Sequence, residues 1–218
     1  MGTLALDTQK ASPDIYISLG LKAMGKRVIG VPPVLSLLST LLERTVQRNE
    51  TLLEEKHVED VVTLFHGLRA PTLSIPKYID RIFKYSGCSP SCFVVAHIYV
   101  DRFLQQSEVK LTSLNVHRLL ITSIMIAAKF MDDAFFNNAY YAKVGGISTT
   151  ELNRLEMNFL FSIDFRLQVS IDIFGKYCSQ LEKEAAEALE VERPIQACRI
   201  KESWSNKDDS TCASTIAR

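Results

Sequence analysis

The feature that most restricts the fold of this chain is an apolar run over residues 119–131, which ends at Asp132 and Asp133. Its apolar residues recur at the spacing of an α-helix, and very few of its side chains are charged. The run also contains two adjacent small residues, Ala127 and Ala128, which allow neighbouring helices to approach closely. The run therefore predicts a central helix that is surrounded by other helices.

Start signals for further helices lie on both sides of this run. Prolines at 32–33 and at 90 suit the first turn of a helix, where a missing N–H is harmless. Asn115 can cap the central helix, and Ser148 with Glu151 has the spacing of a capping box. We expect helices over about 34–48, 75–86, 90–105, 116–130, 149–159 and 171–181, with a short element near Tyr140 that stops at Gly145-Gly146.

The pattern favours an all-α single domain. Strand-like alternation is missing, apart from a possible extended stretch at 165–169. The last predicted helix frays into the charged residues 182–187, and we interpret the run 182–190 as its solvated end. We place the domain at residues 31–185, between a flexible lead-in (1–30) and a flexible tail (186–218).

Neither net charge nor a targeting segment links the chain to nucleic acid, a membrane or secretion. Lysine plus arginine equals aspartate plus glutamate, at 25 each, although a local basic patch remains possible within that balance. The first ten residues do not resemble a secretory signal, and the longest apolar run is too short to span a bilayer. The five cysteines are odd in number and irregularly spaced, which favours reduced thiols. We expect a protein of the nucleus or cytoplasm.

The sequence contains no recognisable catalytic, metal-binding or cofactor motif. Cys88 and Cys92 are spaced as Cys-x3-Cys, but no second pair completes a tetrahedral zinc site. Gly145-Gly146 lacks the lysine and serine that follow in a phosphate-binding loop. His97 lies on an apolar stripe, which favours a core histidine over a metal ligand. We therefore expect no catalytic residue, no metal, no cofactor and no small-molecule substrate.

Two charged residues are the candidate functional side chains. Lys129 lies near the end of the central helix, and Glu156 lies among apolar neighbours of the helix at 149–159. Together they suggest two buried helices that display a cation and an anion at one edge, which suits contact with another protein's backbone. Helix geometry alone also allows a simpler interpretation, in which Lys129 extends along apolar surface into water and Glu156 is a solvated helix residue.

Several segments, in order, resemble one family, the cyclins. They are 99–104 (YVDRFL), 126–130 (IAAKF), 139–147 (AYYAKVGGI), and 155–156 (LE) with 165–167 (FRL). The closer similarity is to the plant P-type (also called U-type) cyclins and to the yeast phosphate-pathway cyclins. The resemblance covers about residues 34–177, which leaves room for a single cyclin box.

The resemblance implies a cyclin-box bundle of about five core helices around a central one, with an added N-terminal helix. It also implies a regulatory subunit that binds and activates a cyclin-dependent kinase, in cell-cycle or nutrient- and phosphate-linked control. By the same resemblance, Lys129 donates to backbone carbonyls of the kinase and Glu156 accepts from its amides. The implied apolar contacts are Ile126, Phe130, Leu160, Phe165 and Leu167.

Two further roles come from the resemblance. Asp133 occupies the position at which yeast phosphate-pathway cyclins hold an arginine of the kinase activation loop. Asp101 is expected to form a structural ion pair, and we nominate Arg81 as its partner. The substrate-recruiting patch of the larger cyclins is not recognisable at 75–79. An alternative function keeps the same fold in a transcription or nucleic-acid-binding adaptor without a kinase partner, although such proteins usually have a basic face and paired boxes.

Overall fold

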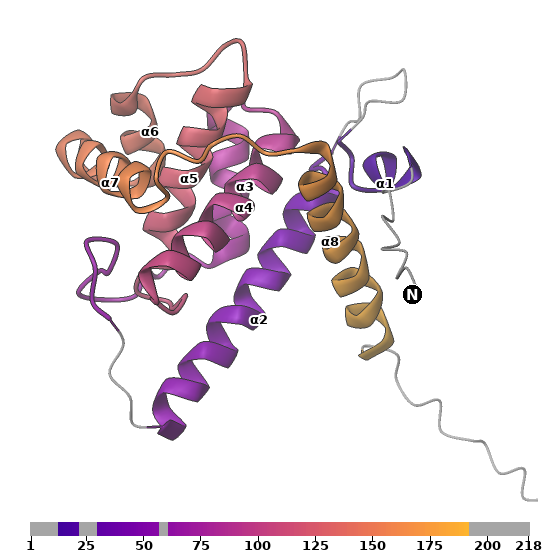
Figure 1. Ribbon diagram of the computed structural model, residues 1–218, viewed down its shortest axis with the longest axis horizontal. Coiled ribbons are helices and arrows are strands. Elements are labelled where there is room, and N and C mark those ends of the chain that lie inside the picture. The colour runs from indigo at the N-terminus through magenta and orange to yellow at the C-terminus, as the bar shows by residue number, and fades with distance from the viewer. Residues whose placement is uncertain (1–12, 22–29, 57–60, 192–218) are drawn as a thin grey trace, which may run out of the picture.

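The computed structural model describes residues 13–21, 30–56 and 61–191, and α-helices are the only regular elements in this part of the chain (Figure 1). The predicted all-α class is confirmed. The helices, in chain order, are α1 (Pro13–Ser18), α2 (Pro33–Lys56), α3 (Ile75–Ser86), α4 (Pro90–Ser107), α5 (Val116–Met131), α6 (Asn138–Gly145), α7 (Thr149–Ser162) and α8 (Ile171–Val191).

The apolar run forms α5, which is the centre of the bundle. Its residues are buried without interruption from Leu119 to Ala128, and it packs most extensively on α4. It also contacts α3, α6 and α7. Ala127 and Ala128 are fully buried, as expected where helices approach closely. The predicted central helix is therefore present.

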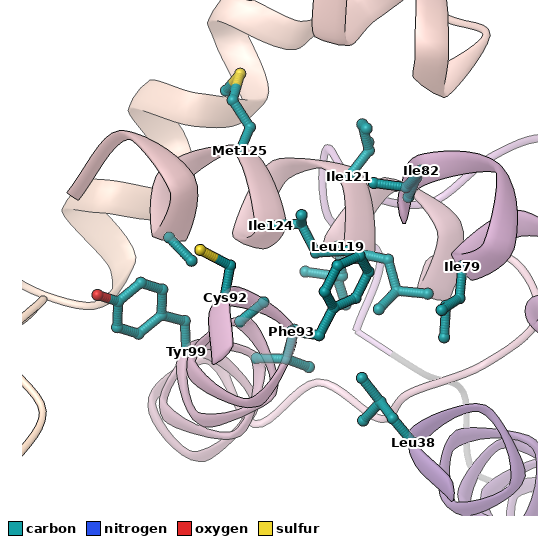
Figure 2. Close-up of a cluster of buried hydrophobic side chains, with 14 of the residues drawn as sticks. Leu38, Ile79, Ile82, Cys92, Phe93, Tyr99, Leu119, Ile121, Ile124 and Met125 are labelled. Atoms are coloured by element: carbon teal, nitrogen blue, oxygen red, sulfur yellow. The ribbon is translucent and has the colours of Figure 1, made fainter. Parts of the chain in front are cut away.

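The core is built from side chains of several helices that meet on α5. Figure 2 shows Phe93 of α4 pointing toward Leu119 of α5, with Ile79 of α3 and Leu38 of α2 beside it. All four side chains are almost completely buried. Burial of one such side chain contributes about 1.5–3 kcal/mol. This contact region therefore stabilises the packing of the four helices α2, α3, α4 and α5.

Helix ends follow the start and stop signals of the sequence in most places. Gly87 and Gly146 end α3 and α6 with left-handed backbones, at φ 64° and 75°, which glycine adopts without steric cost. The Ser148 side chain accepts from the Glu151 N–H at 3.0 Å, as a capping box requires. The Glu151 carboxylate, however, pairs with Arg118 of α5 at 2.7 Å instead of turning back to the cap.

The prediction that the Asn115 side chain caps α5 is wrong. Asn115 occupies the N-cap position, but its side chain makes no capping hydrogen bond. Its Oδ1 accepts from the Thr112 N–H at 2.9 Å, and its Nδ2 donates to the Lys110 carbonyl at 2.7 Å. The buried amide therefore satisfies two backbone groups of the preceding loop, at Lys110 and Thr112.

The first helices differ from expectation. Within the predicted lead-in, residues 13–18 form α1, and Leu19 behind it is buried. Tyr16 of α1 stacks on Phe174 of α8, with ring centroids 6.1 Å apart. Helix α2 continues beyond residue 48 to Lys56, because Asn49 and Glu50 hydrogen-bond the backbone of the 111–113 loop at 3.0 and 2.8 Å. The remainder of the lead-in, 1–12 and 22–29, lies outside the described residues.

Helix α8 includes the charged run, as its interpretation as a helix end requires, but it does not fray at 182–187 and continues to Val191, beyond the domain boundary expected at 185. Contacts with other helices support this extension. Glu182 accepts from the Ser18 hydroxyl at 3.0 Å, and Glu184 lies 3.7 Å from Arg44 of α2. The tail beyond Val191 lies outside the described residues.

The stretch at 165–169 is not a strand. Asp164 and Phe165 both have left-handed backbones, at φ 55° and 51°, which turn the chain sharply after α7. The segment that follows is held by α4: the Tyr99 hydroxyl donates to the Leu167 carbonyl at 2.6 Å, and Arg102 donates to the carbonyls of Arg166 and Gln168. Side chains of α4 therefore replace the partner strand that an extended segment would require.

Candidate functional site

The two charged residues that the sequence singled out meet at one edge of the bundle. The Lys129 Nζ at the end of α5 lies 2.7 Å from the Glu156 Oε1 of α7. Neither head is fully exposed: the Lys129 side chain is 28% exposed and that of Glu156 16%. The tertiary fold brings them together across 27 positions of sequence, and both remain accessible to a partner.

A third residue, Asn138 at the start of α6, completes this arrangement and was missed from the sequence. Its Oδ1 accepts from the Lys129 ammonium, and its Nδ2 donates to the Glu156 Oε2 at 2.6 Å. The same Nδ2 also donates to the Asn153 Oδ1 at 2.8 Å. We call Lys129, Asn138 and Glu156 the edge cluster. An asparagine in a polar loop gives no sequence signal for this role, since it depends on how α6 packs against α7.

Large apolar side chains lie exposed on the segments that carry the edge cluster. Phe130, which follows Lys129, is 54% exposed, and Phe165 beyond α7 is 52% exposed. Phe161, which the sequence interpretation did not include, is 66% exposed and packs edge-on against Phe165, with centroids 5.2 Å apart. Exposed aromatic groups of this kind mark interaction surfaces more often than single exposed leucines do.

Not all of the predicted apolar contacts are exposed. Ile126 is only 3% exposed and belongs to the core, so its place in a surface patch is wrong. The reason is helical geometry: Ile126 lies one turn before Phe130, where α5 is still enclosed by its neighbours. Leu160 is half-buried, one turn after Glu156, and Leu167 is also half-buried.

An apolar groove begins beside Phe130. Its volume is about 470 Å³, and its walls come from the end of α5, the start of α4, the segment after α7, α8 and α1. Phe130, Met131, Leu167, Phe174 and Tyr16 are among its lining residues. The described N-terminal residues therefore form one wall of the groove without filling it.

The two aspartates after α5 have different surroundings. The Asp132 Oδ2 accepts from the Ser89 N–H at 2.9 Å and from the Cys92 thiol at 3.4 Å. The Cys92 thiol also has a raised pKa, caused first by its hydrogen bond with Cys88 and then by burial. We call Ser89, Cys92 and Asp132 the inner cluster. Asp133, the residue that the resemblance singled out, is exposed to solvent.

The predicted ion pair between Arg81 and Asp101 is not formed. Arg81 of α3 donates to the Lys143 carbonyl of α6 at 3.3 Å, whereas Asp101 of α4 accepts from the Tyr177 hydroxyl of α8 at 2.9 Å. The pair does not form because Asp101 bonds to α8, whereas Arg81 bonds to α6. The adjacent Arg102 has the structural role instead, because it holds the carbonyls that follow α7.

One histidine and three cysteines of the described residues lie in the interior. His97 is buried and its Nδ1 has no hydrogen-bond partner, and burial lowers its pKa. Cys88, Cys92 and Cys178 are free thiols in the interior, while the other two cysteines fall outside the described ranges. The described residues include no group of three or more histidine, cysteine or acidic side chains that could hold a metal. Within the same residues, no helix combines the length and apolar character needed to cross a membrane.

Comparison with known proteins agrees with this architecture. The model of the family described as Cyclin matches residues 33–167. The chain is 53% identical over 227 residues to Cyclin-P3-1 of Oryza sativa subsp. japonica, covering 100% of this chain and 95% of that protein. It is 51% identical over 221 residues to Cyclin-U3-1 of Arabidopsis thaliana, covering 100% of both. The protein belongs to the cyclin family and is similar to its plant P-type and U-type members.

Proposed function

We propose that this cyclin is a regulatory subunit that binds and activates a cyclin-dependent kinase through the edge cluster and the exposed phenylalanines beside it. The observation that carries the proposal is the Lys129–Glu156 pair, with its heads 2.7 Å apart and partly exposed next to Phe130. A cation and an anion side by side fit a partner that offers both an acceptor and a donor.

The junction of a helix with a loop is such a partner. The helix end leaves either N–H groups or carbonyls without a partner within the helix, and the backbone of the adjoining loop can offer the other kind of group. Lys129 can donate to the carbonyls and Glu156 can accept from the N–H groups, and each charge-assisted hydrogen bond is worth about 1.5–3 kcal/mol. The internal ion pair that they loosen is worth about 0–1 kcal/mol at a partly exposed site, so the exchange favours binding.

The exposed aromatic side chains supply the apolar part of the interface. Phe130 and Phe165 each leave about half of their surface in water. Covering one of them removes enough apolar area to contribute on the order of 1 kcal/mol. The adjacent groove of about 470 Å³ can accept an apolar side chain from the same partner.

The chain would activate the kinase by holding one helix of it in place. In protein kinases a glutamate on a mobile helix must pair with the lysine that contacts ATP before phosphoryl transfer proceeds. A helix that docks on the edge cluster is fixed in one position, which favours that ion pair. The cyclin supplies no group to the reaction itself.

Asp133 extends the proposal to the activation loop of the kinase. Its carboxylate is exposed, one residue beyond Asp132, and is free of the hydrogen bonds that hold Asp132 to α4. We assign it the task of holding an arginine that a phosphate otherwise holds. With an unphosphorylated kinase, D133N is expected to lose most of the activity, whereas with the phosphorylated kinase it behaves as wild type. Equal activity of D133N and wild type on the unphosphorylated kinase excludes this role.

A charge-swap series tests the main proposal. The variants are K129E, E156K and the double swap K129E/E156K, each titrated with a purified plant cyclin-dependent kinase by calorimetry. We expect each single variant to weaken binding about tenfold to a hundredfold, because one contact is reversed. The double swap rebuilds the internal ion pair and restores stability, but it presents reversed charges to the kinase and stays weak.

Lys176, an exposed lysine of α8, supplies the matched control. K176E changes the net charge as K129E does but should bind with wild-type affinity. Phosphate incorporation into a substrate peptide should follow the binding order. If the double swap recovers kinase affinity along with its stability, the edge cluster acts only within the fold and the proposal is wrong.

A further inference from the structure

A second pocket lies between α3 and α6, on a different face of α6 from the edge cluster. Its volume is about 540 Å³, and it is lined by Arg81, Tyr85, Tyr140, Lys143 and Val144. We call it the α3–α6 pocket. Asn138 and Lys143 are five residues apart on α6, which places them about 140° apart around the helix axis. A ligand in this pocket therefore does not need the kinase-binding residues.

The pocket is cationic although the whole chain is neutral. Helices α3 and α6 carry four basic residues, Lys77, Arg81, Lys84 and Lys143, against a single carboxylate, that of Asp80. Arg81 donates only to a backbone carbonyl, at 3.3 Å, and Lys84 lies over the Tyr85 ring, 5.4 Å from its centroid. In the described part of the chain, no carboxylate lies within ion-pair distance of Arg81, Lys84 or Lys143. These charges are available to an anionic ligand.

A fixed aromatic surface adjoins the cations. The Tyr140 ring stacks on Phe136, with centroids 4.0 Å apart, and its hydroxyl donates to the Tyr85 carbonyl at 2.8 Å. Phe136 and Tyr85 are both exposed. Because these rings already hold one another in place, an apolar group can pack on them without the cost of ordering them.

We propose that the α3–α6 pocket binds a peptide segment in which a phosphorylated or acidic side chain lies next to an apolar one. The anionic group sits between Arg81 and Lys143, where two cations can bind it with charge-assisted hydrogen bonds. The neighbouring apolar side chain packs on Phe136 and Tyr140. Nucleic acid fits less well, because it needs a track of cations along its backbone and free aromatic faces for stacking, whereas these charges surround one pocket.

Fluorescence anisotropy with the whole chain alone tests this proposal, so the result does not depend on any kinase. The probe is a fluorescein-labelled peptide with a phosphoserine next to a leucine, compared with twins that carry glutamate or unmodified serine. We expect saturable binding of the phosphoserine and glutamate peptides and at least about tenfold weaker binding of the serine peptide. The double variant R81Q/K143Q should weaken phosphopeptide binding about tenfold, and R81E should weaken it more than R81Q does.

Two controls separate binding from folding. K176Q removes an exposed lysine of α8 that does not line the pocket, and it should bind the phosphopeptide as wild type does. Because Arg81 and Lys143 are exposed, their variants should melt at nearly the wild-type temperature. Equal affinity for the three peptides, unchanged affinity of R81Q/K143Q, or tighter binding of duplex DNA than of phosphopeptide would each overturn the proposal.

Discussion

Two polar clusters meet at the last turn of α5, and they differ in what they leave free. The inner cluster faces α4: Asp132 accepts from the Ser89 N–H and the Cys92 thiol, and Cys92 is fully buried. The edge cluster faces outward: Lys129, Asn138 and Glu156 bond to one another, yet the charged heads are partly exposed beside Phe130. The end of α5 thus stabilises the packing on α4 on one side and exposes charged groups to a partner on the other.

The different burial of the two clusters distinguishes polar groups that stabilise the fold from polar groups that can bind a partner. A carboxylate that accepts hydrogen bonds from donors in the protein interior is costly to remove, because those donors are then left without an acceptor. A partly exposed ion pair contributes little to folding, since water can replace each partner. A cluster of the second kind, next to exposed aromatic rings, is a candidate for binding, and substitutions can test this division.

The largest expected effect is on the inner cluster. D132A should lower the free energy of unfolding by about 1–3 kcal/mol, because the partly buried Ser89 N–H and the buried Cys92 thiol lose their acceptor. D133A, one residue further along and exposed, should change it by less than about 0.5 kcal/mol. Urea denaturation followed by circular dichroism measures both. Equal losses in the two variants would remove the distinction between the neighbouring aspartates.

The next effect concerns the exposed aromatic residue of the edge. F130A should weaken binding to the kinase about tenfold, because an apolar contact of one side chain is lost on binding. Its stability should remain close to that of the wild type, since the Phe130 ring is half in water already. Calorimetric titration and a urea melt on the same sample separate the two quantities. A large loss of stability without loss of affinity would place Phe130 with the core.

A smaller effect is expected at the third member of the edge cluster. N138A should lower the unfolding free energy by about 1 kcal/mol, because Asn138 bonds both Lys129 and Glu156. In a double-mutant cycle with E156Q, the two changes should be non-additive by about 0.5 kcal/mol or more. Strictly additive changes would mean that Asn138 stabilises only its own helix, α6, and is not coupled to Glu156. The edge cluster would then be only the Lys129–Glu156 ion pair.

The smallest expected effect is a pH dependence of stability. It comes from His97, a buried side chain that belongs to neither cluster. Burial holds the pKa of His97 below its usual value, so the folded state keeps the ring neutral while the unfolded chain protonates below about pH 6.5. Stability should therefore be highest above that pH and fall as pH is lowered, by at most about 0.7 kcal/mol between about pH 7 and pH 6. H97Q should flatten this part of the urea-derived stability profile. An unchanged slope would show that His97 is not the titrating group.

The local sequence predicted the helices well where their signals are self-contained. The apolar run at 119–131, the prolines that start α2 and α4, and the glycines that end α3 and α6 act within one or two turns of chain. The placement of Lys129 and Glu156 at one edge was an expectation drawn from their two helical segments, and the resemblance to cyclins favoured it over the simpler interpretation. Their 2.7 Å contact agrees with that expectation.

The errors arise where distant segments decide the outcome. Helix α8 continues past residue 182 because α1 and α2 offer partners to Glu182 and Glu184. Ile126 is 3% exposed and Phe130 54%, although both lie on the same stripe of α5, because packing by other helices covers the first position and leaves the second in water. Arg81 and Asp101, which the resemblance to cyclins suggested as a pair, bond to different helices, α6 and α8.

Local signals in the amino-acid sequence suffice for the helical class, the central helix and the family, because periodicity, caps and short motifs act over a few residues. Three features depend on the folded chain: Asn138 joins Lys129 and Glu156, Asp132 turns inward while Asp133 stays in water, and α3 and α6 enclose a cationic pocket. The physical reason is that burial and partner choice depend on which surfaces meet, and those surfaces come from residues far apart along the chain.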